Sequence, residues 1–257
     1  MRKHLIHKTI PFTLLLGSLM LSSRASAIVN IEDLRLDDSV QGVSGSFTVN
    51  FNGKSGNTDN LAGSTNIGLQ YVHHQQVELL LASYEYSEVN GKGNDESKFL
   101  HLRHTDWFKP HWAWEAYTQY EAQPYVLDKV RTLLGAGGRW KNQFKQYKGI
   151  LGGSIFYEKE EVDLQRRETF EVGRFNWMAE GQYVLSKQAK MGVSLFFQPK
   201  VDEWKNNRSI VNWTLSTQVV STVSMTMSVN YRHDSQPYLD LKADDWQYSM
   251  GINYQFK

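Results

Sequence analysis

Charged residues near the middle of the chain occur at spacings that would bring opposite charges together across two neighbouring strands. They occupy polar positions of two consecutive alternating segments, in the order Glu115, Glu121, Arg131 and Arg139. Pairing Trp112 with Trp140 would set the register of these segments. In that register Glu121 falls opposite Arg131. Arg139 lies diagonal to Glu115, and cross-strand neighbours of opposite charge attract each other.

Further charged residues extend this set toward the C-terminus. They lie at polar positions of later alternating segments and are Arg174, Glu180, Arg208 and Arg232. Mutual pairing is expected of them, because an enclosed charge is costly when it is alone. Two interpretations stay open: an internal ion-pair network that fills and stiffens the protein, or a ring that selects small charged solutes.

Histidines raise the question of a metal site, and the four concerned are His73, His74, His101 and His104. His101 and His104 have the spacing of one helical face, but their segment alternates as a strand does. The two side chains would then face opposite sides. The chain has no cysteine, which removes zinc-ribbon, redox and disulfide-scaffold interpretations. We therefore expect no metal site and no cofactor.

The elements that must position these residues have a dominant period of two. From about Gly42 onward, apolar and aromatic residues alternate with small polar residues or charges, which is the pattern of half-buried strands. The clearest apolar face is that of the last segment, with Trp246, Tyr248, Met250, Ile252, Tyr254 and Phe256. The pattern predicts about twelve strands, over residues 42–51, 61–73, 76–87, 98–107, 112–122, 130–140, 147–157, 170–185, 190–198, 208–219, 223–232 and 246–256. The third and fourth are ambiguous in face, since residues 77–82 are apolar on both sides.

The first residues have the features of an export signal rather than of a folded element. Three basic residues precede an apolar run over 10–21, and Ala25-Ser26-Ala27 forms an A-x-A cleavage site. The apolar run is too short for a transmembrane helix. We predict a signal peptide over residues 1–27, a short periplasmic segment over 28–41 that forms a plug or lies disordered, and one β-domain over 42–257.

The connections between the predicted strands indicate which ends face which compartment. Those after even-numbered strands are mostly short, and those after odd-numbered strands are long and polar, over 52–60, 88–97, 123–129, 158–169, 199–207 and 233–245. Outer-membrane barrels have long extracellular loops, short periplasmic turns and an even number of strands. Both chain ends would then lie in the periplasm.

Aromatic residues favour lipid over a soluble core as the surroundings of the apolar face. Aromatic residues make up 13% of the chain, a high share for a soluble domain. At predicted strand ends they form two candidate interface girdles, one with Trp107, Trp112, Trp114, Tyr254 and Phe256 and the other with Tyr157, Tyr231, Trp246 and Tyr248. The sequence therefore predicts an all-β fold, a closed antiparallel transmembrane β-barrel of about twelve strands in the bacterial outer membrane.

The C-terminal strand carries a possible assembly signal. Its pattern Ser249-x-Gly251-x-x-Tyr254-x-Phe256 resembles the motif that the barrel-assembly machinery recognises, with Lys257 added after the final aromatic residue. The net charge of +1 gives no field that would attract nucleic acid. The expected partners are this machinery, outer-membrane lipid and lipopolysaccharide, with no nucleic acid, and the pattern sets no oligomeric state.

Three further stretches resemble the DUF481 (YdiY-like) family, whose members are described as salt-induced outer-membrane proteins. Ser55-Gly56-Asn57-Thr58-Asp59 looks like its loop motif, Leu134-Gly135-Ala136-Gly137-Gly138 is similar to its glycine strand, and Tyr231-Arg232-His233-Asp234-Ser235-Gln236-Pro237 is similar to its penultimate loop. The resemblance implies an outer-membrane barrel associated with envelope stress, and it brings no catalytic residues. The Ser55–Asp59 loop most simply supplies turn chemistry; binding of a surface cation or lipopolysaccharide is the alternative.

Two functions from different classes stay open. The first is a structural barrel or narrow small-solute pore, linked to salt or acid stress of the envelope. Twelve strands lie between about eight, which side chains fill, and about sixteen, which leave an aqueous channel. The alternative is a surface hydrolase acting on lipid or peptide, for which Ser55, Asp59, His104 and Asp106 are the available groups. Because His104 and Asp106 lie toward the predicted periplasmic end, opposite Ser55, we expect no enzyme activity.

Overall fold

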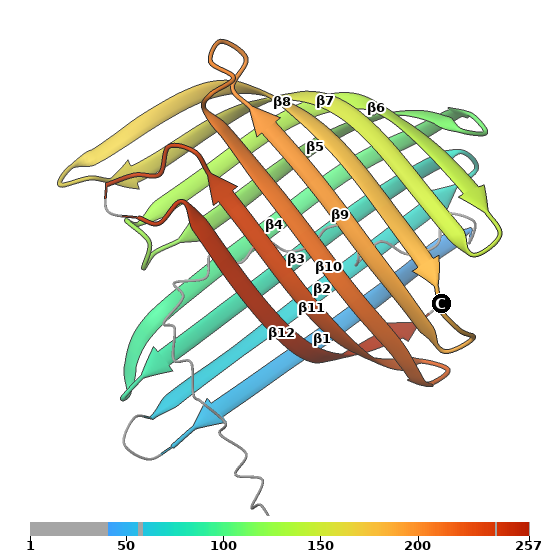
Figure 1. The fold of residues 1–257 in the computed structure, drawn as a ribbon, viewed down its shortest axis with the longest axis horizontal. Helices are drawn as coiled ribbons and strands as arrows, with labels where there is room; N and C mark the ends of the chain where they lie inside the picture. The colour runs from blue at the N-terminus through green and yellow to red at the C-terminus, as the bar shows by residue number, and fades with distance from the viewer. Residues whose placement is uncertain (1–40, 56–58, 240, 257) are drawn as a thin grey trace, which may run out of the picture.

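Twelve antiparallel strands form one closed barrel in the computed structural model, which describes residues 41–55, 59–239 and 241–256 (Figure 1). Each strand pairs with its sequence neighbours, and the last strand returns to pair with the first. The strands are β1 (Gly42–Lys54), β2 (Asn60–His73), β3 (Gln76–Val89), β4 (Lys92–Lys109), β5 (Trp112–Gln123), β6 (Lys129–Phe144), β7 (Tyr147–Asp163), β8 (Arg167–Val184), β9 (Ala189–Pro199), β10 (Asn207–Val220), β11 (Val223–Asp234) and β12 (Asp244–Phe256). The predicted fold class and strand number are confirmed.

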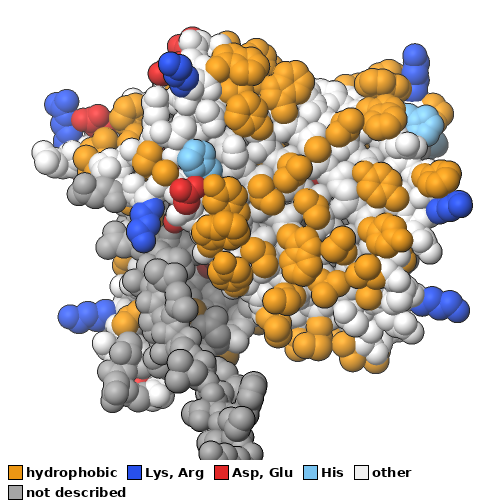
Figure 2. Space-filling view, in the orientation of Figure 1, with side chains coloured by type: hydrophobic (Ala, Val, Ile, Leu, Met, Phe, Trp, Pro, Cys, Tyr) orange, Lys and Arg blue, Asp and Glu red, His pale blue; other side chains and the backbone are white. Residues whose placement is uncertain are grey.

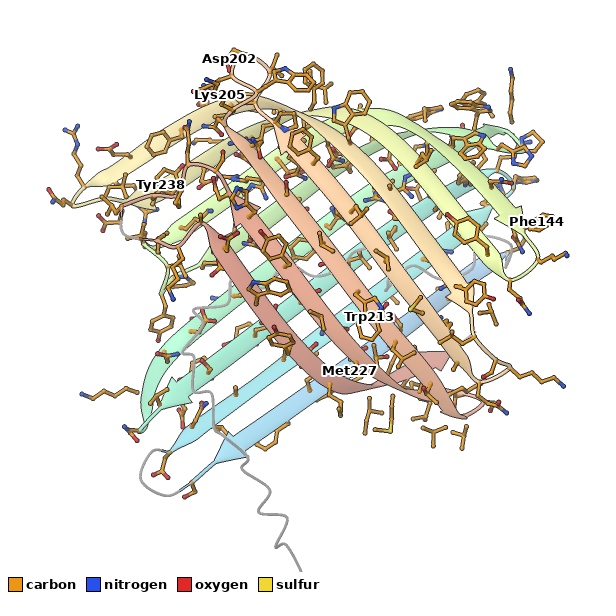
Figure 3. The ribbon with its side chains drawn as sticks, viewed as in Figure 1. Phe144, Asp202, Lys205, Trp213, Met227 and Tyr238 are labelled. Carbon is orange, nitrogen blue, oxygen red and sulfur yellow. The ribbon has the colours of Figure 1, made fainter. Side chains whose placement is uncertain are left out.

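Alternation along the strands separates an apolar exterior from the lumen. In the β11–β12 pair, Tyr231 lies opposite Trp246, and Val229 lies opposite Tyr248. These outward side chains join into an apolar surface, with charged side chains toward both ends of the barrel (Figure 2). Figure 3 places Asp202 and Lys205 at one end of the barrel and Phe144 at the other. The exterior is therefore apolar around the middle of the barrel and polar at its ends.

Two of the predicted long connections are in fact hairpins with tight turns. The structure contradicts the predicted loop over 88–97, because β3 and β4 continue to a turn at Asn90 and Gly91, which have φ angles of 52° and 71°. It also contradicts the predicted loop over 158–169, because β7 runs to Asp163 and β8 begins at Arg167. Backbone pairing needs no apolar side chains, so the end of the apolar alternation marks the edge of the apolar surface and not the end of a strand.

The other predicted long connections remain the long ones. They span residues 55–59, 124–128, 200–206 and 235–243, and all lie at the same end of the barrel as the two hairpins. At the opposite end, two-residue turns at 74–75, 110–111, 145–146 and 221–222 and a four-residue turn at 185–188 join the strands. The alternation of long and short connections thus holds after β1, β5, β9 and β11.

The interior is not uniformly polar, and β3 is the clearest exception. Its inward side chains include Leu79 and Leu81, which pack with Phe99 of β4. Two more apolar clusters lie inside the barrel, one with Val72, Val77, Trp107 and Ala113 and one with Tyr117, Leu133 and Phe156. These side chains fill part of the lumen and narrow it on the side of β2 to β7.

The predicted export signal lies outside the described residues, as do residues 28–40 of the predicted periplasmic segment. Gln41, the last residue of that segment, exchanges two hydrogen bonds with the backbone of His74, at 2.9 and 3.3 Å. This contact fixes the beginning of β1 against the β2–β3 turn. No helix in the described ranges is long and apolar enough to cross a membrane.

Candidate functional site in the barrel lumen

The register predicted between β5 and β6 is the register found. Trp112 lies opposite Trp140, and Glu121 lies opposite Arg131. Both of these charged side chains are buried, and Arg131 Nη1 lies 3.7 Å from Glu121 Oε2. A second acceptor, Glu158 of β7, receives a hydrogen bond from Arg131 Nε and forms an ion pair with it. Arg131 therefore bridges two carboxylates.

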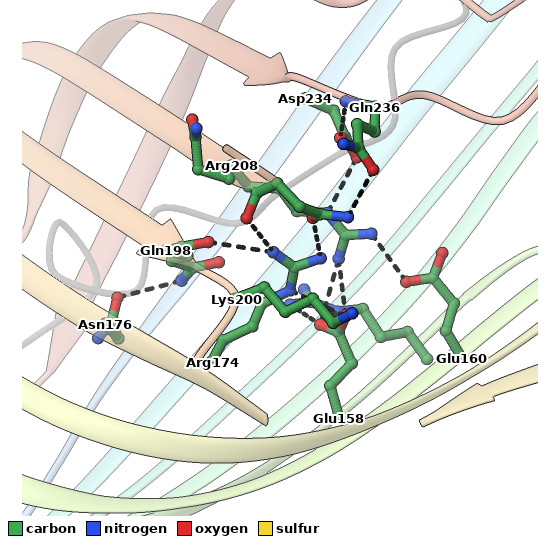
Figure 4. A network of polar contacts seen from close by, with 12 residues as sticks. Glu158, Glu160, Arg174, Asn176, Gln198, Lys200, Arg208, Asp234 and Gln236 are labelled. Carbon is green, nitrogen blue, oxygen red and sulfur yellow. Dashed lines mark hydrogen bonds and ion pairs between the residues drawn. The ribbon is translucent and has the colours of Figure 1, made fainter. Parts of the chain in front are cut away.

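Glu158 is the centre of the charged cluster, which we define as the ion-paired residues around it (Figure 4). Its side chain is only 2% exposed and contacts three guanidinium groups. Arg174 Nε lies 3.4 Å away, and Arg208 Nη1 lies 3.0 and 3.2 Å from the two carboxylate oxygens. A buried carboxylate with three cationic partners is compensated for the loss of its hydration.

Glu160, two residues further along β7, extends the cluster to the rim of the barrel through further ion pairs. Lys129 Nζ lies 3.0 Å from its carboxylate, and Arg208 Nη2 lies 3.1 Å away. Arg208 Nε also donates a hydrogen bond to Asp234 at 2.9 Å. Neither glutamate is among the predicted site residues, because the apolar alternation predicts a loop over 158–169. The signal that could have found them is the continuing inward period Phe156, Glu158 and Glu160.

Two connections lie over this cluster at the rim. In the 235–243 connection, the ring of Tyr238 packs at a tilt against Phe170 of β8, with ring centroids 5.3 Å apart. Burial raises the pKa of Tyr238, and the nearby charge of Glu160 raises it further. Asn206 of the 200–206 connection donates a hydrogen bond to Gln236 at 2.9 Å. Arg174 donates hydrogen bonds to Asn206 at 3.0 and 3.4 Å, and the Tyr238 hydroxyl hydrogen-bonds to Glu160, so both connections lie against the charged cluster.

A second group of charges lies deeper in the lumen, around Glu115. Arg139 forms an ion pair with Glu115, and Arg103 Nη1 lies 3.8 Å from the same carboxylate. Glu180 lies 4.0 Å from Arg139 Nη2. The structure thus brings together Glu115, Arg139 and Glu180 of the predicted set in one group, and Glu121, Arg131, Arg174 and Arg208 in the other. Arg103 is an additional member, outside the predicted set.

Arg232 of β11 differs from the other predicted arginines. Its Nη2 atom is buried, and within the described residues it has no hydrogen-bond partner. Its guanidinium lies in the field of Glu121 and Asp245, together with that of Arg131. Arg232 therefore borders the charged cluster without a direct ion pair in this part of the chain.

The opposite wall of the lumen, from β9 through β12 to β2, carries mainly uncharged polar groups below Arg208, Arg232 and Asp234, which lie toward the end with the long connections. In the described part of the chain, several of them have buried oxygen or nitrogen atoms without a hydrogen-bond partner, namely Ser44, Ser46, Gln70, Asn212 and Asn230. Buried polar groups normally have a partner, in the protein or in water. This wall is thus chemically suited to face water or a polar solute, whereas the wall from β4 to β8 is filled by ion pairs and apolar side chains.

The remaining predicted positions do not join these groups. Ser55 donates a hydrogen bond to Asp59 at 2.9 Å, and Gly56, Asn57 and Thr58 lie outside the described residues. Asp106 pairs with Gln76 at the opposite end of the barrel. The structure therefore does not assemble the Ser, His and Asp groups that a hydrolase would need.

Of the four histidines, His73 and His74 contact each other at the β2–β3 turn, with 2.9 Å between Nε2 and Nδ1. The other two lie in different surroundings. His101 is buried in the lumen between Phe99 and Tyr117, while His104 contacts Glu78 at 2.6 Å, with 28% and 54% of the two side chains exposed. Within the described ranges, no group of three or more His, Asp or Glu residues is arranged to hold a metal ion.

In the C-terminal signal, Tyr254 pairs with Phe47 of β1, and Phe256 pairs with Gly45. Gly251 lies against Asn50 of β1, so close that an added Cβ would overlap the Asn50 amide. The three predicted signal residues thus lie where the barrel closes.

Comparisons with known proteins concern the whole of this barrel. Residues 48–256 match the family described as "Protein of unknown function, DUF481", and no curated protein matches the sequence. The solved NanC porin is similar, with 11% identity and a TM-score of 0.50, over 83% of this chain and 100% of that chain.

Two further solved structures are similar at lower scores. An outer membrane channel from Pseudomonas putida F1 has 9% identity and a TM-score of 0.49, over 89% of this chain and 99% of that chain. The translocator domain of the autotransporter NalP from Neisseria meningitidis has 10% identity and a TM-score of 0.48, over 88% and 93%. At these identities the likeness concerns the fold alone.

Proposed function

This chain belongs to the DUF481 family, and we propose that it is an integral outer-membrane barrel that forms a narrow channel for small polar solutes. The apolar exterior supports membrane insertion, because only a closed barrel or helices satisfy every backbone group in hydrocarbon. The long connections would then lie outside the cell and the two-residue turns in the periplasm. Cleavage of the predicted signal peptide and recognition by the assembly machinery belong to the same proposal.

The division of the lumen wall is the observation that carries the channel proposal. Unpartnered hydroxyl and amide atoms line the side from β9 through β12 to β2, where a hydrated solute would find hydrogen-bond partners. The charged cluster spans the extracellular mouth from one side to the other, with Glu158 of β7 and Arg208 of β10 at its centre. A solute would pass along the uncharged wall and be sorted by charge at the mouth.

Planar-bilayer recording of the purified, refolded protein tests this function. We expect discrete single-channel steps whose size depends on salt concentration. Replacing Arg208 with Gln should shift the permeability ratio severalfold toward cations, because it removes a positive charge from the mouth while both neighbouring glutamates stay. Arg166, with 85% of its side chain exposed in a connection, offers the matched control Arg166→Gln, which should leave the ratio unchanged.

Heat-modifiable migration on a gel verifies that each variant is folded before its current is recorded. A folded wild-type barrel that gives no current steps would contradict the channel, and equal ratios for both variants would contradict charge sorting by the cluster.

Contact with lipopolysaccharide at the extracellular rim is part of the proposal, and no observation favours the hydrolase.

We also propose an association with salt or acid stress of the envelope, which rests on the family resemblance. A strain that lacks this gene should grow more slowly than its parent at raised salt or lowered pH, and expression of the chain in trans should restore growth. Equal growth of both strains under these conditions would remove the association and leave the channel proposal unaffected.

A further inference from the structure

The seam between β1 and β12 is paired along only part of its length. The register runs from Gly45↔Phe256 to Val49↔Ile252, which is five residue pairs in the described part of the chain. Both strands continue beyond this point, β1 to Lys54 and β12 back to Asp244. By contrast, β7 and β8 are registered from Tyr147↔Tyr183 to Asp163↔Arg167. Figure 1 shows β1 and β12 diverging toward the end that carries the long connections.

Extending the register would place Phe51 opposite Met250 and Gly53 opposite Tyr248, but neither pair forms. The unpaired residues of β1 are still bonded to β2, and those of β12 to β11. Among the described residues, each strand therefore has one row of backbone groups without a strand partner on the side that faces the other strand. In hydrocarbon such groups cost several kcal/mol each, so this part of the seam must face water or a polar ligand.

The lumen side of the open part is polar. Asn50 of β1 donates a hydrogen bond to Ser64 at 2.9 Å, and Gln247 of β12 hydrogen-bonds to Glu85 of β3. Glu85 also lies in the field of Asp95, a second carboxylate. Within the described residues neither acid has an ion pair with a Lys or Arg side chain. The lumen side of the open part therefore favours a ligand that donates hydrogen bonds, as an amine or hydroxyl group does.

The outer side of the same opening is apolar. Phe51 is 74% exposed on β1, and Tyr248 and Met250 are 71% and 64% exposed on β12. A polar inner edge beside an apolar outer edge matches the two parts of a membrane amphiphile, whose head prefers polar groups and whose chain prefers apolar ones.

We propose that the extracellular half of the β1–β12 seam is a lateral portal for an amphiphile of the surrounding bilayer. Its hydrogen-bond-donating head group enters the lumen beside Gln247 and Glu85, while its acyl chain stays outside against Phe51 and Met250. The portal rests on the membrane insertion that the proposed function includes, and it does not depend on conductance.

Cysteine pairs test whether the seam is open, because the chain has no native cysteine. Phe47→Cys with Tyr254→Cys joins a paired position and should form a disulfide on oxidation. Phe51→Cys with Met250→Cys joins the positions that an extended register would pair, and it should remain reduced. Equal cross-linking of both pairs on a non-reducing gel would mean that the seam is closed, and the portal would be rejected.

Labelling by a membrane-dissolved long-chain alkyl maleimide tests access from the bilayer. Single cysteines are placed at Ser249, which faces the lumen at the portal, and at Thr214, which faces the lumen in the same row two strands away. We expect Ser249→Cys to react at least an order of magnitude faster than Thr214→Cys in phosphatidylethanolamine-containing vesicles, because only the portal position is reachable from lipid.

An outward position separates the two possible failures. A nitroxide spin label attached to Met250→Cys before reconstitution should be relaxed by oxygen dissolved in the bilayer in any membrane-inserted barrel, since this side chain is exposed on the apolar face. A label at Met250→Cys that is reached only by water-soluble relaxing agents would overturn membrane insertion and with it the proposed function. A lipid-exposed label at Met250→Cys together with equally slow maleimide labelling of Ser249→Cys and Thr214→Cys would overturn the portal alone.

Discussion

Replacing Glu158 with Gln is expected to lower the free energy of unfolding of the barrel by about 3–5 kcal/mol, the usual cost of removing one partner of a buried ion pair. The glutamine keeps the shape and one acceptor oxygen but loses the charge. The guanidinium groups of Arg131, Arg174 and Arg208 would then share less negative charge in a place where water cannot replace it. No other carboxylate in the described part of the chain contacts three arginines.

Glu161 provides the matched control, because it lies three residues away on the same strand and also forms ion pairs. Its partners Lys159 and Arg167 are about half exposed, with distances of 3.0 and 3.4 Å. Solvent-exposed pairs contribute about 0–1 kcal/mol, so Glu161→Gln should cost no more than that. Urea titration of the refolded barrel in lipid vesicles, followed by tryptophan fluorescence, measures both values.

A double substitution distinguishes charge compensation from a merely structural role of the Glu158 side chain. Adding Arg174→Gln to Glu158→Gln removes one of the cations that the first change leaves uncompensated, so part of the lost stability should return. Two outcomes would contradict the central place of Glu158 in the cluster. One is a double variant whose loss of unfolding free energy equals the sum of the two single losses. The other is a loss for Glu158→Gln that is no larger than the loss for Glu161→Gln.

Much of this barrel was predictable from the sequence, because alternation with period two directly gives the number of strands, their order along the chain and the side of the sheet to which each side chain points. The pair Trp112 and Trp140 also sufficed to predict one register and its Glu121–Arg131 contact. The hairpins at 88–97 and 158–169 were not predictable in the same way. Their strands continue past the apolar surface, where side chains no longer reveal the pairing of the backbone.

The composition of the charged cluster depends on the closure of the barrel and could not be predicted. Glu158 and Arg208 are 50 residues apart on β7 and β10, with two strands between them, and they meet across the lumen. Such contacts are set by strand tilt and stagger, which a local pattern does not contain. For the same reason the incomplete β1–β12 seam has no counterpart in the alternation of either strand.

The glycines of β6 have separate physical roles, which explains their number in the stretch Leu134-Gly135-Ala136-Gly137-Gly138. An added Cβ at Gly135 would meet the ring of Tyr117, whose hydroxyl lies 2.9 Å from Ser154 Oγ. At Gly137 an added Cβ would overlap the backbone carbonyl oxygen of Gly153 and the Cβ of Ser154. Gly137 therefore allows β6 and β7 to lie together, whereas Gly135 leaves room for one flexible side chain.

Gly137→Ala is accordingly expected to lower the free energy of unfolding by at least about 1–3 kcal/mol, the usual effect of overpacking, because backbone atoms must move to admit the methyl group. Gly138→Ala is the matched control: it adds the same methyl group one residue along, where the nearest atom is the Ala113 carbonyl oxygen at 3.7 Å. Urea titration should separate the two variants, and the fraction that migrates as folded barrel before boiling should fall only for Gly137→Ala. Equal loss in both variants would mean that the whole strand, rather than its contact with β7, is sensitive to added volume.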